Sequence, residues 1–185
     1  MKPKFALHCC VAAVALAIVA LAADDKDKKD APKAAAKNAG FERIKQLAGE
    51  WAGRDVDGLF KEEIRVHYKV TAAGSAVVET LFPGSTHEMV TVYHQDGDDL
   101  LLTHYCAAGN QPRMRAERGG DANKIAFKFA GATNMKSEND MHMHEATITF
   151  PDNDTIKSEW THYKDNKATG TVKFELKRAA KQAAK

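Results

Sequence analysis

The sequence contains few cysteines, and they are unevenly placed. Of its 3 cysteines among 185 residues, Cys9 and Cys10 lie in an N-terminal apolar segment and Cys106 lies in the body of the chain. If that segment is removed on export, Cys106 has no partner within the chain. Disulfide bonds are therefore excluded as the scaffold of the fold, although exported proteins commonly use them.

No apolar run is long enough for a typical membrane span, which needs about 20 residues. The longest run, residues 5–23, follows Lys2 and Lys4 and ends in small residues before the charged segment that begins at Asp24. This order is typical of a secretory signal peptide. We therefore expect residues 1–23 to be a signal peptide, export to the periplasm or the medium, and no stable membrane anchor.

The chain also has no excess of charge of one sign. Without residues 1–23, it would hold 25 basic and 25 acidic residues. Because nucleic-acid-binding domains carry a basic surface, we expect no nucleic-acid partner. Residues 24–38 are charged and rich in alanine and predict a disordered linker, residues 179–185 predict a basic tail, and residues 39–178 predict one domain.

Hydrophobic periodicity predicts an all-β domain after one short helix. Phe41, Ile44 and Leu47 recur at helical spacing, and the residues after Gly49 alternate with period two. The connections are too short for crossover helices, so neighbouring strands must pair antiparallel, and one dry face over ten strands favours closure into a barrel. The expected strands are 50–56, 62–70, 76–82, 88–94, 98–106, 113–117, 124–130, 141–150, 154–163 and 168–178.

Four turn sequences predict the register of these strands. "TAAGS", "HQDGD", "FPDND" and "YKDNK" each suit a three-residue loop that ends in Gly or Asn. This register places Glu79, Lys157 and Glu175 on the solvent face. It predicts that the following residues lie opposite each other: Tyr68 and Val78, Val92 and Leu100, His142 and His162, His144 and Trp160, Ile148 and Ile156, and Ile156 and Phe174.

The first strand carries a short motif of a known group of barrels. Gly49-Glu50-Trp51, followed by Gly53, resembles the Gly-x-Trp entry of the calycins, which include lipocalins, fatty-acid-binding proteins and nitrobindin-type haem proteins. The resemblance implies a calycin-like barrel whose floor is closed by Trp51 under a basic residue of the last strand, here Arg178. Two family features have no counterpart: the Thr-Asp-Tyr signature of lipocalins and the two-helix lid of fatty-acid-binding proteins.

A second resemblance covers residues 41–178. This region is similar to a group of uncharacterised exported bacterial proteins that carry a segment close to "LLTHYCAAGNQPRM", residues 101–114 here. That similarity supplies no activity. Within the segment, His104 and Cys106 share one face of a strand, and their Cβ atoms are about 7 Å apart. This distance favours a small buried thiol at Cys106 over a nucleophilic Cys–His pair.

Histidines are unusually frequent on the predicted inner face. The register turns five of them inward, and we expect them to line a pocket for a small apolar or mixed-polarity molecule. Arg113 follows the rim turn and could face an acidic ligand group, and residues 131–140 form either a surface loop or a flap over the mouth. The predicted ligand-binding residues are His94, His104, Arg113, His142, His144, Trp160 and His162.

The sequence leaves open two cofactors, a metal ion and haem, and two functional classes other than small-molecule binding, an enzyme and an interaction protein. Imidazoles of His142, His144 and His162 could hold a divalent metal ion that activates water, which would make the protein a hydrolase-like enzyme. One neutral histidine could instead bind haem iron. The barrel could also act as a surface interaction protein without an internal ligand. The aromatic cup for haem would consist of Phe127, Phe129, Phe150, Trp160 and Phe174.

Overall fold

The computed structural model describes residues 38–119, 121 and 123–180. The predicted signal peptide, almost all of the predicted linker and most of the predicted tail lie outside these residues, so those expectations stay predictions. Among the helices of the described residues, none combines the length and the apolar character of a membrane span.

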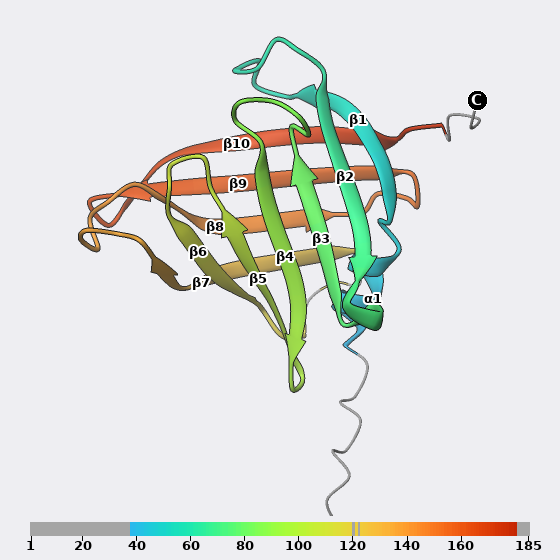
Figure 1. Cartoon of the computed structure of the whole chain (residues 1–185), viewed down its shortest axis with the longest axis horizontal. Helices are drawn as coiled ribbons and strands as arrows, with labels where there is room; N and C mark the ends of the chain where they lie inside the picture. Colours follow the sequence, from blue (N-terminus) through green and yellow to red (C-terminus); the bar gives the residue numbers. More distant parts are fainter. Residues whose placement is uncertain (1–37, 120, 122, 181–185) are drawn as a thin grey trace, which may run out of the picture. The chain divides into compact units, whose positions relative to one another are not determined.

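Ten strands form a closed antiparallel barrel, as the periodicity predicted (Figure 1). Each strand pairs with its neighbours in sequence, and β1 pairs with β10, so the barrel formed by the described residues has no unpaired edge. The elements are α1 (Ala39–Lys45), β1 (Gly49–Asp55), β2 (Ile64–Thr71), the 3-10 turn η1 (Ala72–Gly74), β3 (Ala76–Leu81), β4 (Met89–Asp96), β5 (Asp99–Tyr105), β6 (Gln111–Ala116), β7 (Lys124–Thr133), β8 (His142–Thr149), β9 (Thr155–Lys164) and β10 (Lys167–Arg178).

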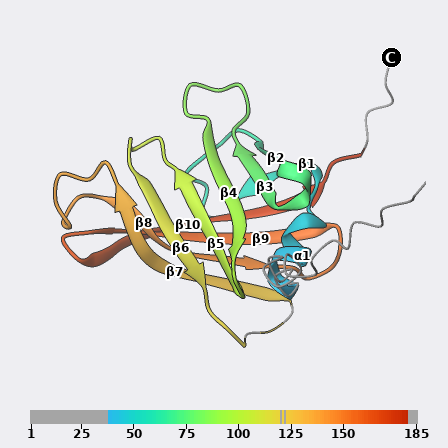
Figure 2. The same ribbon diagram turned by 60° about the horizontal axis from the view of Figure 1, so that its bottom comes forward.

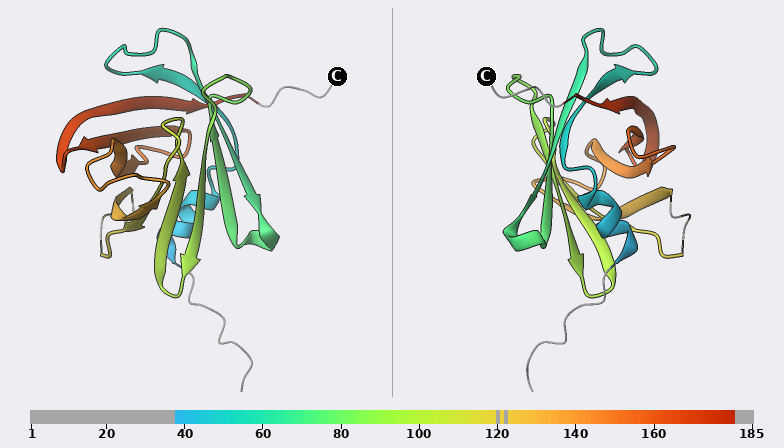
Figure 3. Two further views of the ribbon diagram at one scale, coloured as in Figure 1. Left: turned by 60° about the vertical axis from the view of Figure 1, so that its left-hand side comes forward. Right: turned by 90° about the vertical axis from the view of Figure 1, so that its right-hand side faces the viewer.

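Helix α1 lies at one end of the barrel, between strands β2–β5 and strands β7–β10 (Figures 2 and 3). The side chain of Asn38 caps the helix by accepting a hydrogen bond from the Phe41 N–H. Phe41 and Ile44 point into the core and are at most 2 % exposed. We call this the helix end. The opposite end, where β1–β2, β3–β4, β5–β6, β7–β8 and β9–β10 are joined, is the loop end.

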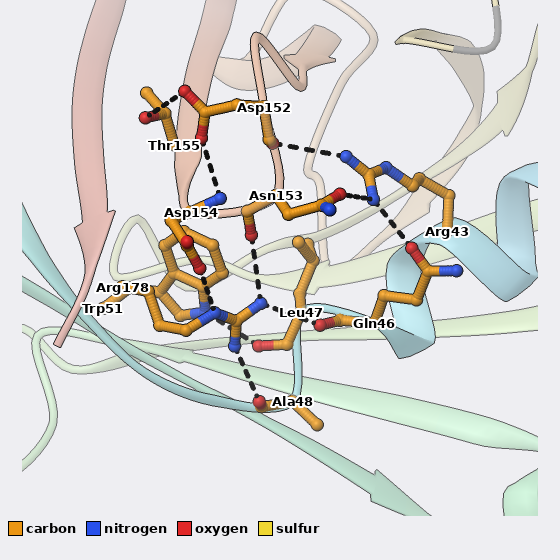
Figure 4. Close-up of polar contacts among 10 residues, drawn as sticks. All are labelled: Arg43, Gln46, Leu47, Ala48, Trp51, Asp152, Asn153, Asp154, Thr155 and Arg178. Atoms are coloured by element: carbon orange, nitrogen blue, oxygen red, sulfur yellow. Dashed lines mark hydrogen bonds and ion pairs between the residues drawn. The ribbon is translucent and has the colours of Figure 1, made fainter. Parts of the chain in front are cut away.

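The predicted stack of Arg178 on Trp51 is present at the helix end (Figure 4). The two residues are opposite each other on β10 and β1, and the guanidinium carbon lies 4.4 Å from the Trp51 ring centroid. Trp51 Nε1 donates to the carbonyl of Leu47, at 2.7 Å. Arg178 also donates to the carbonyl oxygens of Gln46, Ala48 and Asn153 and to Asp154 Oδ1. Arg178 therefore joins β10 to the end of α1 and to the β8–β9 loop.

The predicted buried face is largely correct on six strands. On β2, β5, β7, β8, β9 and β10 the buried residues include Ile64, Val66, Tyr68, Leu100, Leu102, Ile125, Phe127, Ala146, Ile148, Ile156, Phe174 and Leu176. Lys157 and Glu175 both lie on the outer face, as expected, although the structure pairs them with each other, which the predicted register did not.

The prediction for β3 is wrong by one residue. The β2–β3 connection spans four residues, because Thr71 pairs with Ala76 and both Ala72 and Ala73 adopt positive φ before Gly74. Tyr68 is therefore opposite Glu79 instead of Val78. A one-residue shift exchanges the two faces of a strand, so Val77, Glu79 and Leu81 are buried.

The prediction for β4 is wrong for a related reason. Asp96 pairs with Asp99, so the β4–β5 loop has two residues and Val92 lies opposite Thr103 instead of Leu100. Thr91 and Tyr93 are buried at 2 % and 0 % exposure. His94, the next residue, consequently lies on the outer face.

A bulge on β10 restores the predicted faces although the β9–β10 turn differs, whereas a bulge on β8 changes the pairing at the loop end. Asp165 and Asn166, both at positive φ, form a two-residue β9–β10 turn, and a bulge between Ala168 and Gly170 then corrects the alternation. On β8 a bulge lies between Met143 and Glu145. Several predicted pairs are therefore wrong: His142 faces Tyr163, His162 faces Met143 and Gly170, Trp160 faces Ala146 and Val172, Ile148 faces Ser158, and Ile156 faces Leu176.

Candidate functional site

The middle of the barrel is filled by side chains. Tyr93, Leu102, Met114 and Phe127 are 0 % exposed, so no water-sized space touches them. His104 on β5 contacts Trp160 on β9 across the barrel, with 4.9 Å between ring centroids. Four of the residues predicted as a haem cup, Phe127, Phe150, Trp160 and Phe174, belong to this buried core.

A buried carboxyl group lies inside the barrel. Tyr93 donates a hydrogen bond of 2.5 Å to Glu79 Oε2, and Tyr68 and Thr91 also bond to the Glu79 side chain. Burial raises the pKa of Glu79 to about 7, although its three hydrogen-bond donors lower it. The pKa values of the Tyr68 and Tyr93 hydroxyls are raised, first by burial and then by the charge of Glu79.

His104 extends this polar group toward Trp160. Thr91 Oγ1 lies 3.0 Å from His104 Nδ1. Burial lowers the pKa of His104 to about 4, so its ring is neutral at pH 7. Its Nε2 is buried and has no hydrogen-bond partner among the described residues. The sequence correctly predicted that His104 points inward. It missed Glu79, because the assumed three-residue turn placed Glu79 on the outer face. The hydroxyl groups of Tyr68 and Tyr93 could have indicated a buried polar partner.

A pocket of about 650 Å³ lies at the loop end, beside β7 and β8. The β7–β8 loop and the β9–β10 turn form its walls. Its lining residues are Phe129, Gly131, Ala132, Met135, Ser137, Glu138, His142, His144 and Asn166. The volume lies within the range of ordinary small-molecule sites, about 300–1,000 Å³.

Two of the predicted histidines meet in this pocket. His142 Nε2 lies 2.9 Å from His144 Nδ1. The His144 ring stacks between Tyr163, at 4.0 Å, and Phe129, at 4.6 Å between centroids. Burial is the main cause that lowers the pKa of His144, and the neighbouring His142 lowers it further.

The hydrogen bonds of this pair determine which nitrogens carry protons when both rings are neutral. His142 Nδ1 lies 2.8 Å from the carbonyl oxygen of Asp140, which can only accept, so Nδ1 carries the proton. His142 Nε2 must then accept from the N–H at His144 Nδ1. His144 Nε2 is left as an acceptor, and no hydrogen bond joins it to another described residue.

The loop that forms one wall is tied to both of its neighbours. Asn134 Nδ2 donates to the Gly109 carbonyl at 2.5 Å, and Asn110 Nδ2 donates to the Met141 carbonyl at 2.8 Å. On the other side, Asn166 Nδ2 donates to Asn139 Oδ1 at 3.0 Å. The segment that the sequence left open as a surface loop or a flap is thus held in place by hydrogen bonds from both sides.

The remaining predicted site residues lie elsewhere. Arg113 is exposed and His94 is on the outer face, and neither lines the loop-end pocket. The Nδ1 atom of His162 lies 2.8 Å from Thr169 Oγ1, and its ring occupies the space where a side chain on Gly170 would begin. Trp160 is 5 % exposed and packs on His104.

The geometry does not fit the predicted three-histidine metal centre. Among the described residues, no group of three or more His, Cys, Asp and Glu side chains is arranged to hold an ion. His142 and His144 bond to each other through two of the nitrogens that would be needed, and His162 bonds to a threonine. These three histidines are therefore not arranged to hold a metal ion that activates water.

Cys106 also lacks the setting of a nucleophile. Its thiol is half-buried, and burial raises its pKa, whereas a reactive thiolate needs a lowered pKa. Its sulfur accepts a hydrogen bond from the Ala108 N–H at 3.5 Å.

A second pocket of about 650 Å³ lies at the helix end, beside α1 and the β4–β5 loop. Its charged residues largely pair with each other or with neighbours. Asp99 binds both Arg115 and Arg118, and these cations lower the pKa of its carboxyl.

Comparison with models of known protein families gave no match, and neither did comparison with curated proteins.

Proposed function

We propose that this protein binds a small, mainly apolar molecule in the loop-end pocket. The observation that carries the proposal is the pocket itself: Phe129 and Met135 give it apolar surface, and the His142–His144 pair and Glu138 give it a few polar groups. Small-molecule sites combine an apolar lining with a few placed polar groups in this way. Under this proposal the ligand binds at the rim of the barrel, whereas the sequence had suggested its lumen.

The tied walls support a preformed site. Hydrogen bonds from Asn110, Asn134 and Asn166 hold the β7–β8 loop, so little ordering entropy is lost on binding. The closed meander, the helix before it and the Trp51–Arg178 stack also support the proposal that the chain is a calycin-type barrel, a fold in which binding at a barrel mouth is common.

Equilibrium titration with N-phenyl-1-naphthylamine tests the proposal, because this neutral probe fluoresces in apolar surroundings. Ala132 lines the pocket, whereas Ala130, in a β-bulge between Phe129 and Gly131 on the same strand, is exposed and does not line it. Ala132→Trp should fill the pocket and weaken binding at least roughly tenfold, while the matched Ala130→Trp should bind as the wild type does. Equal binding by both variants would place the probe elsewhere, and no binding by the wild type would overturn the proposal.

Export is part of the same proposal. If residues 1–23 direct secretion, the protein recovered from the periplasm or medium should begin at Asp24 or one residue earlier, as N-terminal sequencing would show. Recovery of the intact chain from the cytoplasm alone would contradict export.

A further inference from the structure

The lining of the loop-end pocket is selective in charge and in hydrogen-bonding character. Among the described residues that line it, Glu138 is the single acidic one, and none is a lysine or an arginine. Lys128, on the adjacent β7, is bound to Glu145 at 3.0 Å, and Arg113 is exposed outside the pocket. A carboxylate ligand would therefore lose its hydration without gaining a cationic partner, which is unfavourable.

Both the Glu138 carboxylate and the histidine pair offer the ligand a hydrogen-bond acceptor. The two faces of the His144 ring are covered by Phe129 and Tyr163, so only the ring edge can reach a ligand. On that edge Nδ1 donates to His142, which leaves Nε2 with its lone pair. The Asp140 carbonyl fixes this arrangement from the far side of His142, as in other relays where a histidine is oriented by the group behind it.

We propose that the pocket selects neutral or cationic ligands that donate a hydrogen bond, such as alcohols, phenols and amines, and that it rejects carboxylates. His144 Nε2 receives the donated hydrogen, and Phe129 and Met135 contact the apolar body. This inference rests on the proposed binding function and goes beyond it, because it names the ligand chemistry that the site recognises. It also predicts the opposite preference to a barrel that holds fatty acids through a cationic side chain.

Three matched probes separate these properties: 2-naphthol donates a hydrogen bond, 2-methoxynaphthalene has no donor, and 2-naphthoate is an anion. Affinities are measured by calorimetry at pH 8, where histidine is ordinarily neutral and 2-naphthol is largely un-ionised. One hydrogen bond to a placed acceptor is worth roughly tenfold in affinity. We expect 2-naphthol to bind about tenfold more tightly than 2-methoxynaphthalene and 2-naphthoate to bind most weakly.

His144→Phe keeps an aromatic ring between Phe129 and Tyr163 but removes Nε2. In this variant the preference for 2-naphthol over 2-methoxynaphthalene should disappear, while the affinity for 2-methoxynaphthalene stays within about twofold. His94→Phe, on the outer face, is the matched control and should keep the wild-type preference.

The outcomes distinguish the two proposals. If all three probes bind the wild type equally, or if 2-naphthoate binds most tightly, the selectivity is refuted and the pocket stands. If His144→Phe retains the preference, the donor is recognised by another group and the inference fails. If none of the probes, including N-phenyl-1-naphthylamine, binds, then the proposed function fails with it.

Discussion

Replacement of Glu79 by glutamine should stabilise the protein at alkaline pH and leave it nearly unchanged in acid. The pKa of Glu79 rises from 4.5 in the unfolded chain to about 7 in the fold, because burial penalises its charge. The folded state therefore holds this proton more tightly than the unfolded state. From this group, the free energy of unfolding is highest below pH 4.5 and falls as the pH rises to about 7.

The size of the effect follows from the shift. A difference of one pKa unit corresponds to about 1.4 kcal/mol, so the loss at pH 8 is on the order of 3 kcal/mol. Glutamine has nearly the same shape as protonated glutamic acid and, like it, offers one acceptor oxygen and one donor group to the hydroxyls of Tyr68 and Tyr93, which can donate or accept. We expect Glu79→Gln to be more stable than the wild type by about 2–3 kcal/mol at pH 8 and by less than about 1 kcal/mol at pH 4.5.

Urea unfolding of the wild type and the variant across this pH range measures the effect. The difference between the two proteins isolates Glu79, because other titrating groups, including His104, are common to both. Glu159→Gln, on the exposed outer face of β9, is the control and should change the free energy of unfolding at pH 8 by less than about 0.5 kcal/mol. A Glu79→Gln difference that does not change with pH would refute the reasoning.

Three further predictions concern the core and the helix end. The pKa of His104 falls from 6.5 to about 4, so protonation of this ring by itself should remove about 3 kcal/mol of stability as the pH drops through this interval. Because Glu79 titrates over nearly the same interval with the opposite sign, the effect is measured as the difference in urea unfolding between the wild type and His104→Phe, which should change by about that amount. Arg178→Lys keeps the charge but not the planar fork that reaches the carbonyls of Gln46 and Ala48, and should lower the free energy of unfolding by about 2 kcal/mol; an unchanged value would contradict the role of the stack. In Gly53→Ala the new Cβ would lie 2.0 Å from a backbone oxygen of β10, so thermal unfolding should report a loss of about 3 kcal/mol or more, and a stable variant would show that β1 and β10 can separate at little cost.

Much of the fold followed from the sequence because the pattern of the strands is strong. Ten alternating segments with short connections permit few topologies other than an antiparallel meander. The Gly-x-Trp motif correctly placed Trp51 beneath Arg178 because both positions belong to strands that close the barrel.

The errors arose where turn length depends on backbone conformations that side chains do not reveal. Ala72 and Ala73 both adopt positive φ, which alanine rarely does, so nothing in "TAAGS" indicated a fourth loop residue. That one residue moved Glu79 from the predicted surface to the core. On β9–β10 the turn was also misjudged, but the bulge next to Gly170 cancelled the error, so Trp160 still faces inward.

The candidate site was predicted only in part. His142 and His144 were expected to face inward, and they do line the loop-end pocket. Their partners were missed, since a bulge after Met143 shifts the register and brings Tyr163 instead of His162 opposite His142. Bulges depend on the whole sheet and not on local sequence, so the separation of His162 from the pair could not be read from spacing.

The most direct test of this account is an NMR titration that follows the imidazole nitrogens of His144 as 2-naphthol is added at pH 8. In the free protein we expect a proton on Nδ1 and none on Nε2. On binding, the Nε2 resonance should move as it accepts the hydroxyl hydrogen, and 2-methoxynaphthalene should produce no comparable shift. A free protein with the proton on Nε2, or saturation by 2-naphthol with His144 Nε2 unmoved, would contradict the central claim.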